Sequence, residues 1–304
     1  MQQIRAFSYG GGVQSNGALV LSAQVTAGRR DGLTEAEIAA RLRALIGRPV
    51  DLSDAALVEI VDFPLYLFSN VGDDSEYPET LAYVRDHGRP YAEAHGIEFV
   101  ELRRTRVRTG EPFPTIYGTV SDPNLNRNLI PFRMSGGKPG GRSCTADWKV
   151  GVISRELKRR GATAKNPALS GLGISLDEFH RMRSDSGIPH QRLSYPLVDL
   201  RLSRHDCFNI ITRAGLPVPP KSSCYFCPFH TLDAWRRLRD QHPDLFAKAL
   251  EIERANNDRQ ARNGKEPMWL TRFEKPLDQA VGTAVQFDMF TEELDVCESG
   301  YCMV

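Results

Sequence analysis

The stretch Ser8-Tyr9-Gly10-Gly11-Gly12-Val13-Gln14-Ser15 decides how this chain folds. It stands between an apolar run at residues 4–7 and a segment of helical pattern that begins at Ser15. Glycine reaches positive φ and has no side chain, so backbone N–H groups can converge on an anion at such a turn. The helix that follows directs the positive end of its dipole to the same point. The stretch therefore predicts a strand, a phosphate-binding turn and a helix.

The residues expected to contact phosphate at this turn are Ser8, Gly10, Gly11, Gly12, Gln14 and Ser15. No Gly-Lys-Ser/Thr sequence follows, and the glycine spacing differs from that of dinucleotide-binding turns, so neither of those two motifs is present. An ordinary connection between a strand and a helix is the alternative interpretation of three glycines.

Size and composition are those of a globular protein. The chain has 304 residues, of which 41% are hydrophobic and 25% charged, enough to bury a core in one domain with an accessory segment, or in two domains. No apolar run approaches the length of a membrane span, and the first residues do not resemble a signal peptide, so we expect a cytoplasmic protein without a membrane partner. Six scattered cysteines indicate free thiols or metal ligands rather than a disulfide framework.

Basic residues are concentrated in the middle of the chain. Residues 1–100 carry 8 Lys and Arg against 14 Asp and Glu, whereas residues 101–165 carry 14 against 5. This imbalance favours an anionic partner, either a nucleotide or a nucleic acid, and a solvated arginine-rich surface is the alternative. Many of these cations fall in residues 103–143, an irregular segment long enough to indicate a functional loop.

The order of the expected elements predicts a parallel sheet. Helical patterns separate the expected strands, which lie at residues 4–7, 63–68, 97–102, 168–174 and 195–200. Thr34-Glu35-Ala36-Glu37 forms a capping box that opens a helix inside a helical insertion at about residues 31–62. Such alternation predicts an α/β fold, doubly wound, with a mainly parallel sheet between helices. We expect a nucleotide-binding domain at residues 1–215, and at residues 216–304 a Cys-x-x-Cys segment, a helical extension and an acidic tail.

Four motifs in a fixed order resemble one known family. Gly11-Gly12-Val13-Gln14-Ser15 resembles the pyrophosphate-binding loop of the adenine nucleotide alpha-hydrolase (PP-loop ATP pyrophosphatase) superfamily. Phe68-Ser69-Asn70-Val71-Gly72 with Tyr77-Pro78-Glu79-Thr80 resembles the second-strand motif of its phosphoadenosine phosphosulfate (PAPS) reductase branch. Cys144-Thr145 with Trp148-Lys149-Val150, and then Gly173-Ile174-Ser175-Leu176-Asp177-Glu178, are similar to that branch's Cys-Thr...Leu-Lys-Val and Gly-Ile-Arg-x-Asp-Glu motifs. On this resemblance, over residues 4–230, the chain is identified as a divergent member of that branch.

The resemblance implies a HUP-like fold that binds ATP or another adenine nucleotide with Mg²⁺. The further nucleotide contacts that it implies are Asn70, Gly72, Gly173, Ile174, Asp177, Glu178 and Arg181. Asp177, with Glu178 beside it, is a candidate Mg²⁺ or ribose ligand and is included among the candidate catalytic residues. The chain departs from the family where Gln14 replaces the aspartate of adenylating members, and where Ser175 replaces an arginine that recognises sulfate or the 3′-phosphate.

Cys224-Tyr225-Phe226-Cys227 predicts a metal centre, because a Cys-x-x-Cys pair can chelate one and Cys144 can join it in the fold. The resemblance implies a 4Fe-4S cluster, as in APS reductases and several tRNA thiolation enzymes of the superfamily. Zinc held by Cys144, Cys224, Cys227 and His230 is the main alternative, and buried thiols without metal are the second. Cys207, inside an amphipathic helical pattern, is expected in the core.

The tail carries two further candidate catalytic residues, Cys297 and Cys302. A mobile thiolate there could carry sulfur or attack a sulfonyl group, as the C-terminal cysteine of sulfonucleotide reductases does. The neighbours Asp295 and Glu298 would raise the thiol pKa and oppose this role. Either cysteine is also a candidate fourth cluster ligand, and a tail without function is the remaining alternative.

The first predicted function is an ATP-dependent sulfur transferase that adenylates an acceptor and uses an iron–sulfur cluster. Its candidate acceptor is a nucleic acid held by residues 103–160, and its sulfur donor would be a cysteine desulfurase or another donor. The first alternative is a sulfonucleotide (APS or PAPS) reductase that uses a tail cysteine. The second is a non-catalytic nucleotide- and metal-binding module of a DNA-modification or defence complex.

Overall fold

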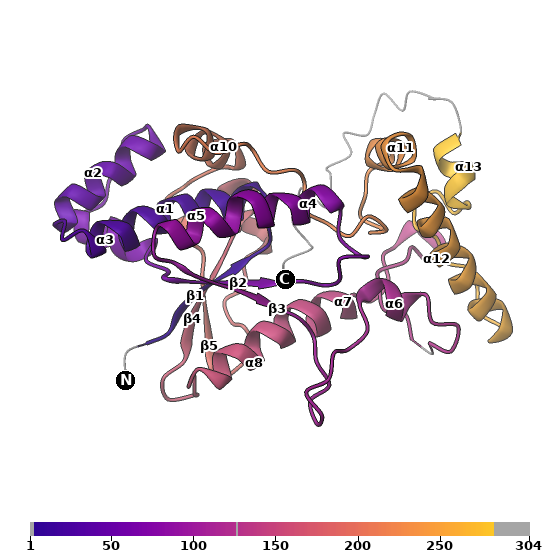
Figure 1. Ribbon diagram of the computed structural model, residues 1–304. Helices are drawn as coiled ribbons and strands as arrows, with labels where there is room; N and C mark the ends of the chain where they lie inside the picture. Colours follow the sequence, from indigo (N-terminus) through magenta and orange to yellow (C-terminus); the bar gives the residue numbers. More distant parts are fainter. Residues whose placement is uncertain (1–2, 126, 283–304) are drawn as a thin grey trace.

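The computed structural model describes residues 3–125 and 127–282. A sheet of five parallel strands crosses it in the order β3-β2-β1-β4-β5 (Figure 1). The strands are β1 (Arg5–Tyr9), β2 (Leu65–Ser69), β3 (Glu98–Leu102), β4 (Ala168–Leu172) and β5 (Gln191–Ser194). Helices flank this sheet, so the predicted α/β class is confirmed, and the strand order is compatible with a doubly wound fold.

One face of the sheet is built on aromatic side chains. Alternate residues of a strand point to opposite faces, and Phe7 and Tyr9 of β1 both point to this one. The Phe7 ring stacks on Tyr66 with 4.9 Å between the ring centroids, and Tyr9 packs edge-on against Phe99 at 5.1 Å. The helices that cover this face in Figure 1 are α1 (Val13–Arg30), α5 (Arg89–Ala94) and α10 (Arg204–Arg213).

The opposite face carries small side chains in the middle of the sheet. Ala6 and Ser8 of β1 and Ser170 of β4 point to it, and α8 (Gly151–Arg159) packs over it through Ile153 and Leu157. Because these strand residues are small, the helix cannot fill the space above them completely. The hollow that remains is part of the candidate site.

Two helices after α1 extend the aromatic face: α2 (Glu35–Ile46) and α3 (Asp54–Ile60). The predicted capping box of α2 is confirmed, since the Thr34 hydroxyl accepts from Glu37 N and the Glu37 carboxylate accepts from Thr34 N. The helix ends at Gly47, whose φ is +73°, the left-handed conformation that favours glycine. Both helices belong to the same core as α1 and α10.

The strand predicted at residues 195–200 is wrong. The fifth strand ends at Ser194, and the next residues form a helical turn, α9 (Pro196–Asp199). Proline has no N–H to contribute to a sheet, while its fixed φ suits the first position of a helix. The apolar residues Leu197 and Leu200 are buried, but they belong to this helical turn and its end.

The C-terminal helices form a second core beside the sheet domain (Figure 1). They are α11 (Leu232–Gln241), α12 (Pro243–Arg262) and α13 (Leu277–Gly282), with α6 (Ile116–Val120) from the middle of the chain. The shorter elements are α4 (Pro78–Tyr83), the π-helical turns η1 (Val84–Gly88) and η3 (Ala146–Val150), the 3-10 turns η2 (Ser135–Gly137) and η4 (Leu176–Arg181), and α7 (Ser143–Thr145).

Glu253 on α12 is a buried carboxyl that ties this second core together. Its side chain accepts hydrogen bonds from the backbone N–H groups of Leu270 and Leu277, both at 2.7 Å, and the residue is 3% exposed. Burial raises the pKa of Glu253 from 4.5 to about 7, against the effect of the two hydrogen bonds. The folded state therefore retains a proton here that the unfolded chain releases above its own pKa.

We expect the free energy of unfolding to fall as the pH rises from about 4.5 to about 7. The folded-state pKa lies above the unfolded one, so the stabilisation is complete below the unfolded pKa and is lost through the folded pKa; the difference corresponds to about 3 kcal/mol at most. Urea unfolding at pH 5 and pH 8 measures it. Glu253→Gln should lose less stability between these pH values than the exposed control Glu251→Gln on the same helix. Equal losses in the two variants would contradict this account.

Candidate functional site

The glycine turn lies where the strand order reverses. The chain passes from β1 outward through β2 and β3, and then returns to place β4 on the other side of β1. Open α/β sheets bind ligands in the crevice outside the carboxyl ends of such strands. Gly173, just after β4, lies against the turn after β1, since a Cβ on it would be 3.2 Å from the backbone nitrogen of Ser15. The fold brings these two predicted glycine segments together.

Asn16 holds the turn from inside. Its side-chain amide, which is fully buried, donates to the carbonyl oxygens of Gly11 at 3.2 Å and Gly12 at 2.9 Å, and its oxygen accepts from the Tyr9 hydroxyl at 2.8 Å. The carbonyl of Gly10 accepts from the Ser222 hydroxyl. All three glycine carbonyls are therefore engaged within the protein.

The N–H groups of this turn are unpaired among the described residues, and Gly12 and Gln14 stand at its partly exposed positions. No hydrogen bond within the described part of the chain uses the N–H of Gly11, Gly12, Val13, Gln14 or Ser15. The first N–H groups of a helix have no partner inside it, and Gly12, the N-cap residue of α1, makes no side-chain cap. With carbonyls turned inward and N–H groups unpaired, the turn is a site for an anion.

A segment from the second half of the chain borders the turn. Ser222 lies beside Gly10 and Gly12, and the Thr80 hydroxyl donates to the Lys221 carbonyl at 3.4 Å. Gly11 is buried beneath the side chains of Thr80 and Val84, whereas Gly10, Gly12 and Gln14 are partly exposed. The turn is covered on one side and remains open on another.

A hollow opens on the α8 face of the sheet, next to the start of the turn. Its floor includes Ser8, two residues before Gly10, and it offers about 740 Å³ between atoms, part of it open to solvent. Its lining is mainly apolar, the usual composition of a small-molecule pocket. The lining residues are Ala6, Ser8, Leu67, Lys149, Val150, Ile153, Ser170, Leu172, Arg183, Ser186, Ile188, Gln191 and Leu193.

Two cations, Lys149 and Arg183, also line the hollow. The Tyr195 hydroxyl fixes the backbone at Arg183, since it accepts from Arg183 N at 2.9 Å and donates to Arg183 O at 3.0 Å. Lys149 belongs to η3, which leads into α8. The hollow thus combines an apolar floor with positive charge at its walls, as a nucleotide would require.

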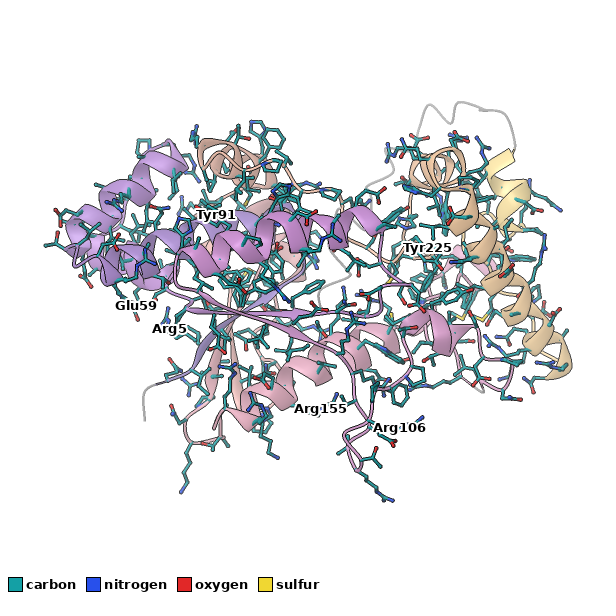
Figure 2. All side chains as sticks on the ribbon, in the orientation of Figure 1. Arg5, Glu59, Tyr91, Arg106, Arg155 and Tyr225 are labelled. Carbon is teal, nitrogen blue, oxygen red and sulfur yellow. The ribbon has the colours of Figure 1, made fainter. Side chains whose placement is uncertain are left out.

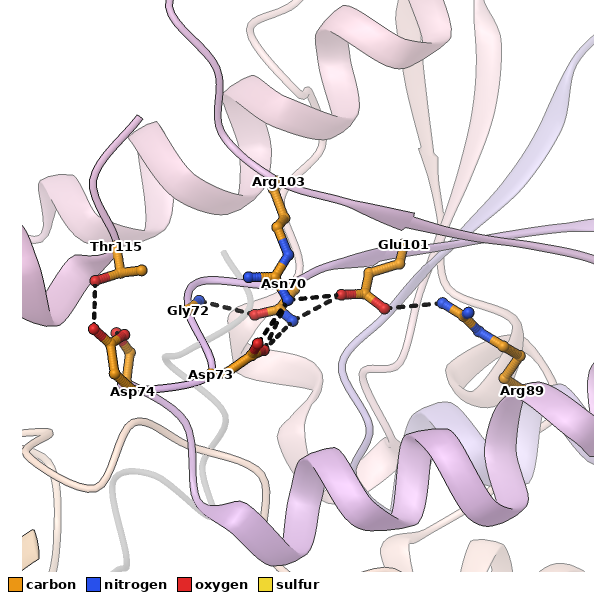
Figure 3. A network of polar contacts seen from close by, with 9 residues as sticks. Asn70, Gly72, Asp73, Asp74, Arg89, Glu101, Arg103 and Thr115 are labelled. Atoms are coloured by element: carbon orange, nitrogen blue, oxygen red, sulfur yellow. Dashed lines mark hydrogen bonds and ion pairs between the residues drawn. The ribbon is translucent and has the colours of Figure 1, made fainter. Parts of the chain in front are cut away.

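Asn70 and Gly72, predicted nucleotide contacts, belong to a polar network at the end of β2 (Figure 3). The Asn70 side chain donates to Asp73 and to Glu101, at 2.8 Å each, and accepts from Gly72 N. Arg103 bridges the two carboxylates, and Arg89 contacts Glu101 at 2.9 Å. The hydrogen bonds from Asn70 and Arg103 lower the pKa of Asp73. The side chain of Asn70 is therefore used to shape the turn after β2.

The motif after β4 divides into an exposed and a buried part. Asp177 is exposed and accepts from the backbone N–H of Arg204 at 2.9 Å. Glu178 and Arg181 form a buried ion pair at 2.6 Å, and burial raises the pKa of Glu178 to about 7. Ile174 is fully buried. Of the predicted contacts in this motif, Gly173 lies against the glycine turn, while Glu178 and Arg181 are buried and paired with each other.

Three predicted metal ligands, Cys144, Cys224 and Cys227, lie in the same region of the second core. Burial raises the pKa of the Cys224 thiol well above its usual range; Glu76, Cys227 and Cys144 raise it further, and Lys149 lowers it. These groups act on one another because they lie close in space, and Cys144 and Cys224 pack on the same core. Lys149 thus lies near Cys224 and also lines the hollow.

The fourth predicted ligand, His230, is differently placed. Its Nε2 lies 3.0 Å from the carbonyl oxygen of Cys224, and its ring packs edge-on against Trp235. Within residues 3–125 and 127–282, no three His, Cys, Asp or Glu side chains are arranged around a single metal ion. The arginines Arg133 and Arg142 lie over Phe229, next to the cysteine turn, and add positive charge there.

The other cysteines separate clearly. Cys207 is buried in α10 against Gly17 of α1, as predicted. Cys297 and Cys302 lie outside the described residues.

Four residues of the candidate site are not among those predicted from the sequence: Asn16, Ser222, Lys149 and Arg183. A polar residue inside an otherwise apolar helix was the available signal for Asn16, and the position before Cys-x-x-Cys was the signal for Ser222.

Comparisons with protein-family models, with curated proteins and with solved structures found no match to this chain. The resemblance to the PAPS reductase branch therefore stays a prediction. None of the helices described above has the length and the apolar composition needed to cross a bilayer.

Proposed function

We propose that the chain is a nucleotide-dependent enzyme of the PP-loop type, which binds the phosphates of ATP on the N–H groups of residues 11–15. The observation that carries this proposal is the polarity of the turn: carbonyls of Gly10, Gly11 and Gly12 are engaged inside the protein, while the N–H groups that follow have no partner among the described residues. A plain connection also leaves the first N–H groups of its helix unpaired, but it does not require the three glycine carbonyls to be held by Asn16 and Ser222.

The hollow beside the turn would hold the nucleoside. Phosphates at the turn place the rest of a nucleotide within reach of Ser8 and Leu172, at the carboxyl ends of β1 and β4. Lys149 and Arg183 would then face the charge that develops at the α-phosphate, where fixed cations stabilise a transition state most effectively. Mg²⁺ would bind chiefly through the phosphates, with Asp177 as the exposed candidate ligand from the chain.

The reaction that this site supports best is adenylation followed by sulfur transfer. An acceptor oxygen attacks the α-phosphorus, the bond to the β-phosphate oxygen breaks, and pyrophosphate leaves. A hydrosulfide ion then attacks the activated carbon, the C–O bond breaks, and AMP leaves with the electron pair. Where the donor is the persulfide of a cysteine desulfurase, a thiol reductant first releases the hydrosulfide and is itself oxidised to a disulfide. The turn and the two cations contribute by positioning and electrostatics. The basic middle of the chain would hold a nucleic-acid acceptor.

The cysteines fit a thiolate-ligated cluster better than a zinc ion. Cys144, Cys224 and Cys227 supply three soft sulfur ligands, whereas His230 Nε2 faces a carbonyl oxygen. A 4Fe-4S cluster held by three cysteines would provide one iron with an open position, the chemistry that suits sulfur transfer. The cations Lys149, Arg133 and Arg142 nearby would offset its negative charge.

Incubation with ATP, Mg²⁺, sulfide and a nucleic-acid mixture tests the proposed class of reaction. Formation of AMP and pyrophosphate supports it. Release of sulfite from APS or PAPS, with no AMP from ATP, would replace it by the reductase reaction. Tight nucleotide binding without any product would contradict an enzymatic function and would support the non-catalytic nucleotide-binding module.

The hollow can be tested apart from the turn. Ser8→Leu would fill the space above the sheet without changing charge, since Ser8 points into the hollow. We expect it to weaken ATP binding at least tenfold and to leave the binding of inorganic triphosphate within about twofold, because only the nucleoside part loses its site. Isothermal titration of both ligands measures this. An equal loss for the two ligands, or no loss for ATP, would show that the nucleoside lies elsewhere.

A further inference from the structure

Residues 104–113 form a short hairpin that extends from the end of β3 away from the body of the protein (Figure 1). Thr105 pairs with Pro112 in an antiparallel bridge, Arg106 N donates to Glu111 O at 2.8 Å, and Phe113 N donates to Arg104 O at 2.9 Å. Gly110, with φ +72°, closes the tip by donating to Arg106 O. This segment of the predicted basic loop is thus a defined projection.

The base of the hairpin is fixed to the wall of the candidate site. The Arg104 guanidinium carbon lies 4.0 Å from the ring centroids of both Phe113 and Trp148, so the cation is held between two aromatic rings. Such contacts gain strength when the cation is partly removed from water. Trp148 precedes Lys149, which lines the hollow. The hairpin is therefore anchored on η3, the element that also supplies Lys149 and Val150 to the lining of the hollow.

The tip presents two arginines around an apolar side chain. Arg106, Val107 and Arg108 are all exposed, Val107 to 82%. Neither arginine has an ion-pair partner in the described part of the chain. The nearby carboxylate of Glu111 accepts instead from the Thr109 hydroxyl at 3.1 Å. Arg106 lies over the Phe113 ring, with 5.5 Å between its guanidinium carbon and the ring centroid, and both arginines remain exposed to solvent.

Helix α8 adds cations beside the base of the hairpin. Arg155 and Lys158, three residues apart and both exposed, have no ion-pair partner among the residues described. Burial lowers the pKa of Arg104, and the charges of Arg127 and Arg155 lower it further, against the effect of Asp147. Arg155 thus lies near the hairpin base, and Figure 2 shows it on the same side of the molecule as Arg106.

We infer that this hairpin is a DNA-binding arm whose tip enters the minor groove of a duplex, while Arg155 and Lys158 contact the phosphate backbone. Arginine is favoured in a narrow minor groove, and apolar side chains there act as wedges between base steps. The hairpin tip carries both features: two arginines that can enter the groove, and Val107 between them as the apolar wedge. The inference deepens the proposed function, on which it rests for the role of DNA as acceptor.

Fluorescence anisotropy with a short DNA duplex of A·T-rich centre, in the absence of ATP, tests the arm. We expect Arg106→Ala with Arg108→Ala to weaken binding at least tenfold at low salt and to reduce the salt slope by about 2, because two phosphate or groove contacts are lost. Val107→Ser should weaken binding a few-fold without changing that slope, since no charge is removed. The matched control is the double variant Arg41→Ala with Arg237→Ala, which removes two exposed arginines from α2 and α11 and should bind like the unaltered chain.

An equal loss of DNA affinity in the hairpin variant and in the control would show that the hairpin is not a DNA-binding arm. Preference for an A-form RNA duplex over DNA would overturn its assignment to the minor groove of DNA. A variant that cannot bind nucleotide, such as Gly12→Asp, should still bind the duplex, so the failure of the arm and the failure of the proposed nucleotide site are separate results.

Discussion

Replacing Gly12 by aspartate is expected to abolish ATP binding without unfolding the protein. Gly12 is the N-cap of α1, with φ −89°, and a Cβ on it would meet its nearest neighbour, Ser222, at 3.8 Å. Aspartate is a favoured N-cap residue and would accept from the unpaired N–H groups of the first turn. It would therefore occupy the proposed phosphate site with a like charge, and repulsion of about 4 kcal/mol at 4 Å predicts a loss of a hundredfold or more.

Isothermal titration measures the affinity of the variant for ATP, and thermal unfolding measures its stability. The melting temperature should stay equal or rise slightly, because aspartate and glycine at an N-cap differ by only a few tenths of a kcal/mol in stability. Gly12→Asn is the matched control, because it caps the same N–H groups without charge and should lose less affinity than the aspartate. If the aspartate variant binds ATP as tightly as the unaltered chain, the turn is not part of the nucleotide site.

Removal of one cysteine from the cluster is expected to abolish iron binding. We expect protein purified without oxygen to contain iron, and Cys144→Ala or Cys224→Ala to lose most of it, because two thiolates do not retain a 4Fe-4S cluster. Cys207→Ala is the matched control, since this thiol is buried in α10 away from the other three. Iron and acid-labile sulfide analysis with the absorption spectrum measures the outcome.

Two other results would contradict the cluster. Stoichiometric zinc that is lost in Cys144→Ala and in His230→Ala would establish the zinc site, although His230 Nε2 faces a carbonyl oxygen. If protein purified without oxygen from cells supplied with iron contains no metal, the three cysteines are structural thiols and not metal ligands. In either case the nucleotide site would stand, since it depends on backbone N–H groups and not on the cysteines.

The sheet was largely predictable because its signal is local. Apolar runs bounded by glycine or proline marked four of the five strands, and the capping box at Thr34 marked the start of α2. The strand predicted at residues 195–200 is wrong because a short apolar run is equally compatible with a buried helical turn and with a strand. Only the proline at its second position carried the information that the segment turns.

The candidate site was predictable only in part, because much of it is made by contacts between distant segments. Gly10, Gly11 and Gly12 are visible as a group in the sequence, whereas Ser222, which donates to the Gly10 carbonyl, is 212 residues away along the chain. The hollow depends on small residues of β1 and β4 that become neighbours through strand pairing. Asn70 illustrates the opposite case, since a residue at the expected edge of the sheet uses its side chain within its own turn.

The central claim is that N–H groups of residues 11–15 bind the phosphates of an adenine nucleotide, and amide NMR tests it most directly. Titration of ¹⁵N-labelled protein with a non-hydrolysable ATP analogue and Mg²⁺ should shift the amide resonances of Gly11, Gly12 and Gln14 strongly downfield, as charged hydrogen bonds form. Pyrophosphate alone should shift the same resonances. If the analogue binds while these resonances stay in place and others move, the phosphates lie elsewhere and this account is wrong.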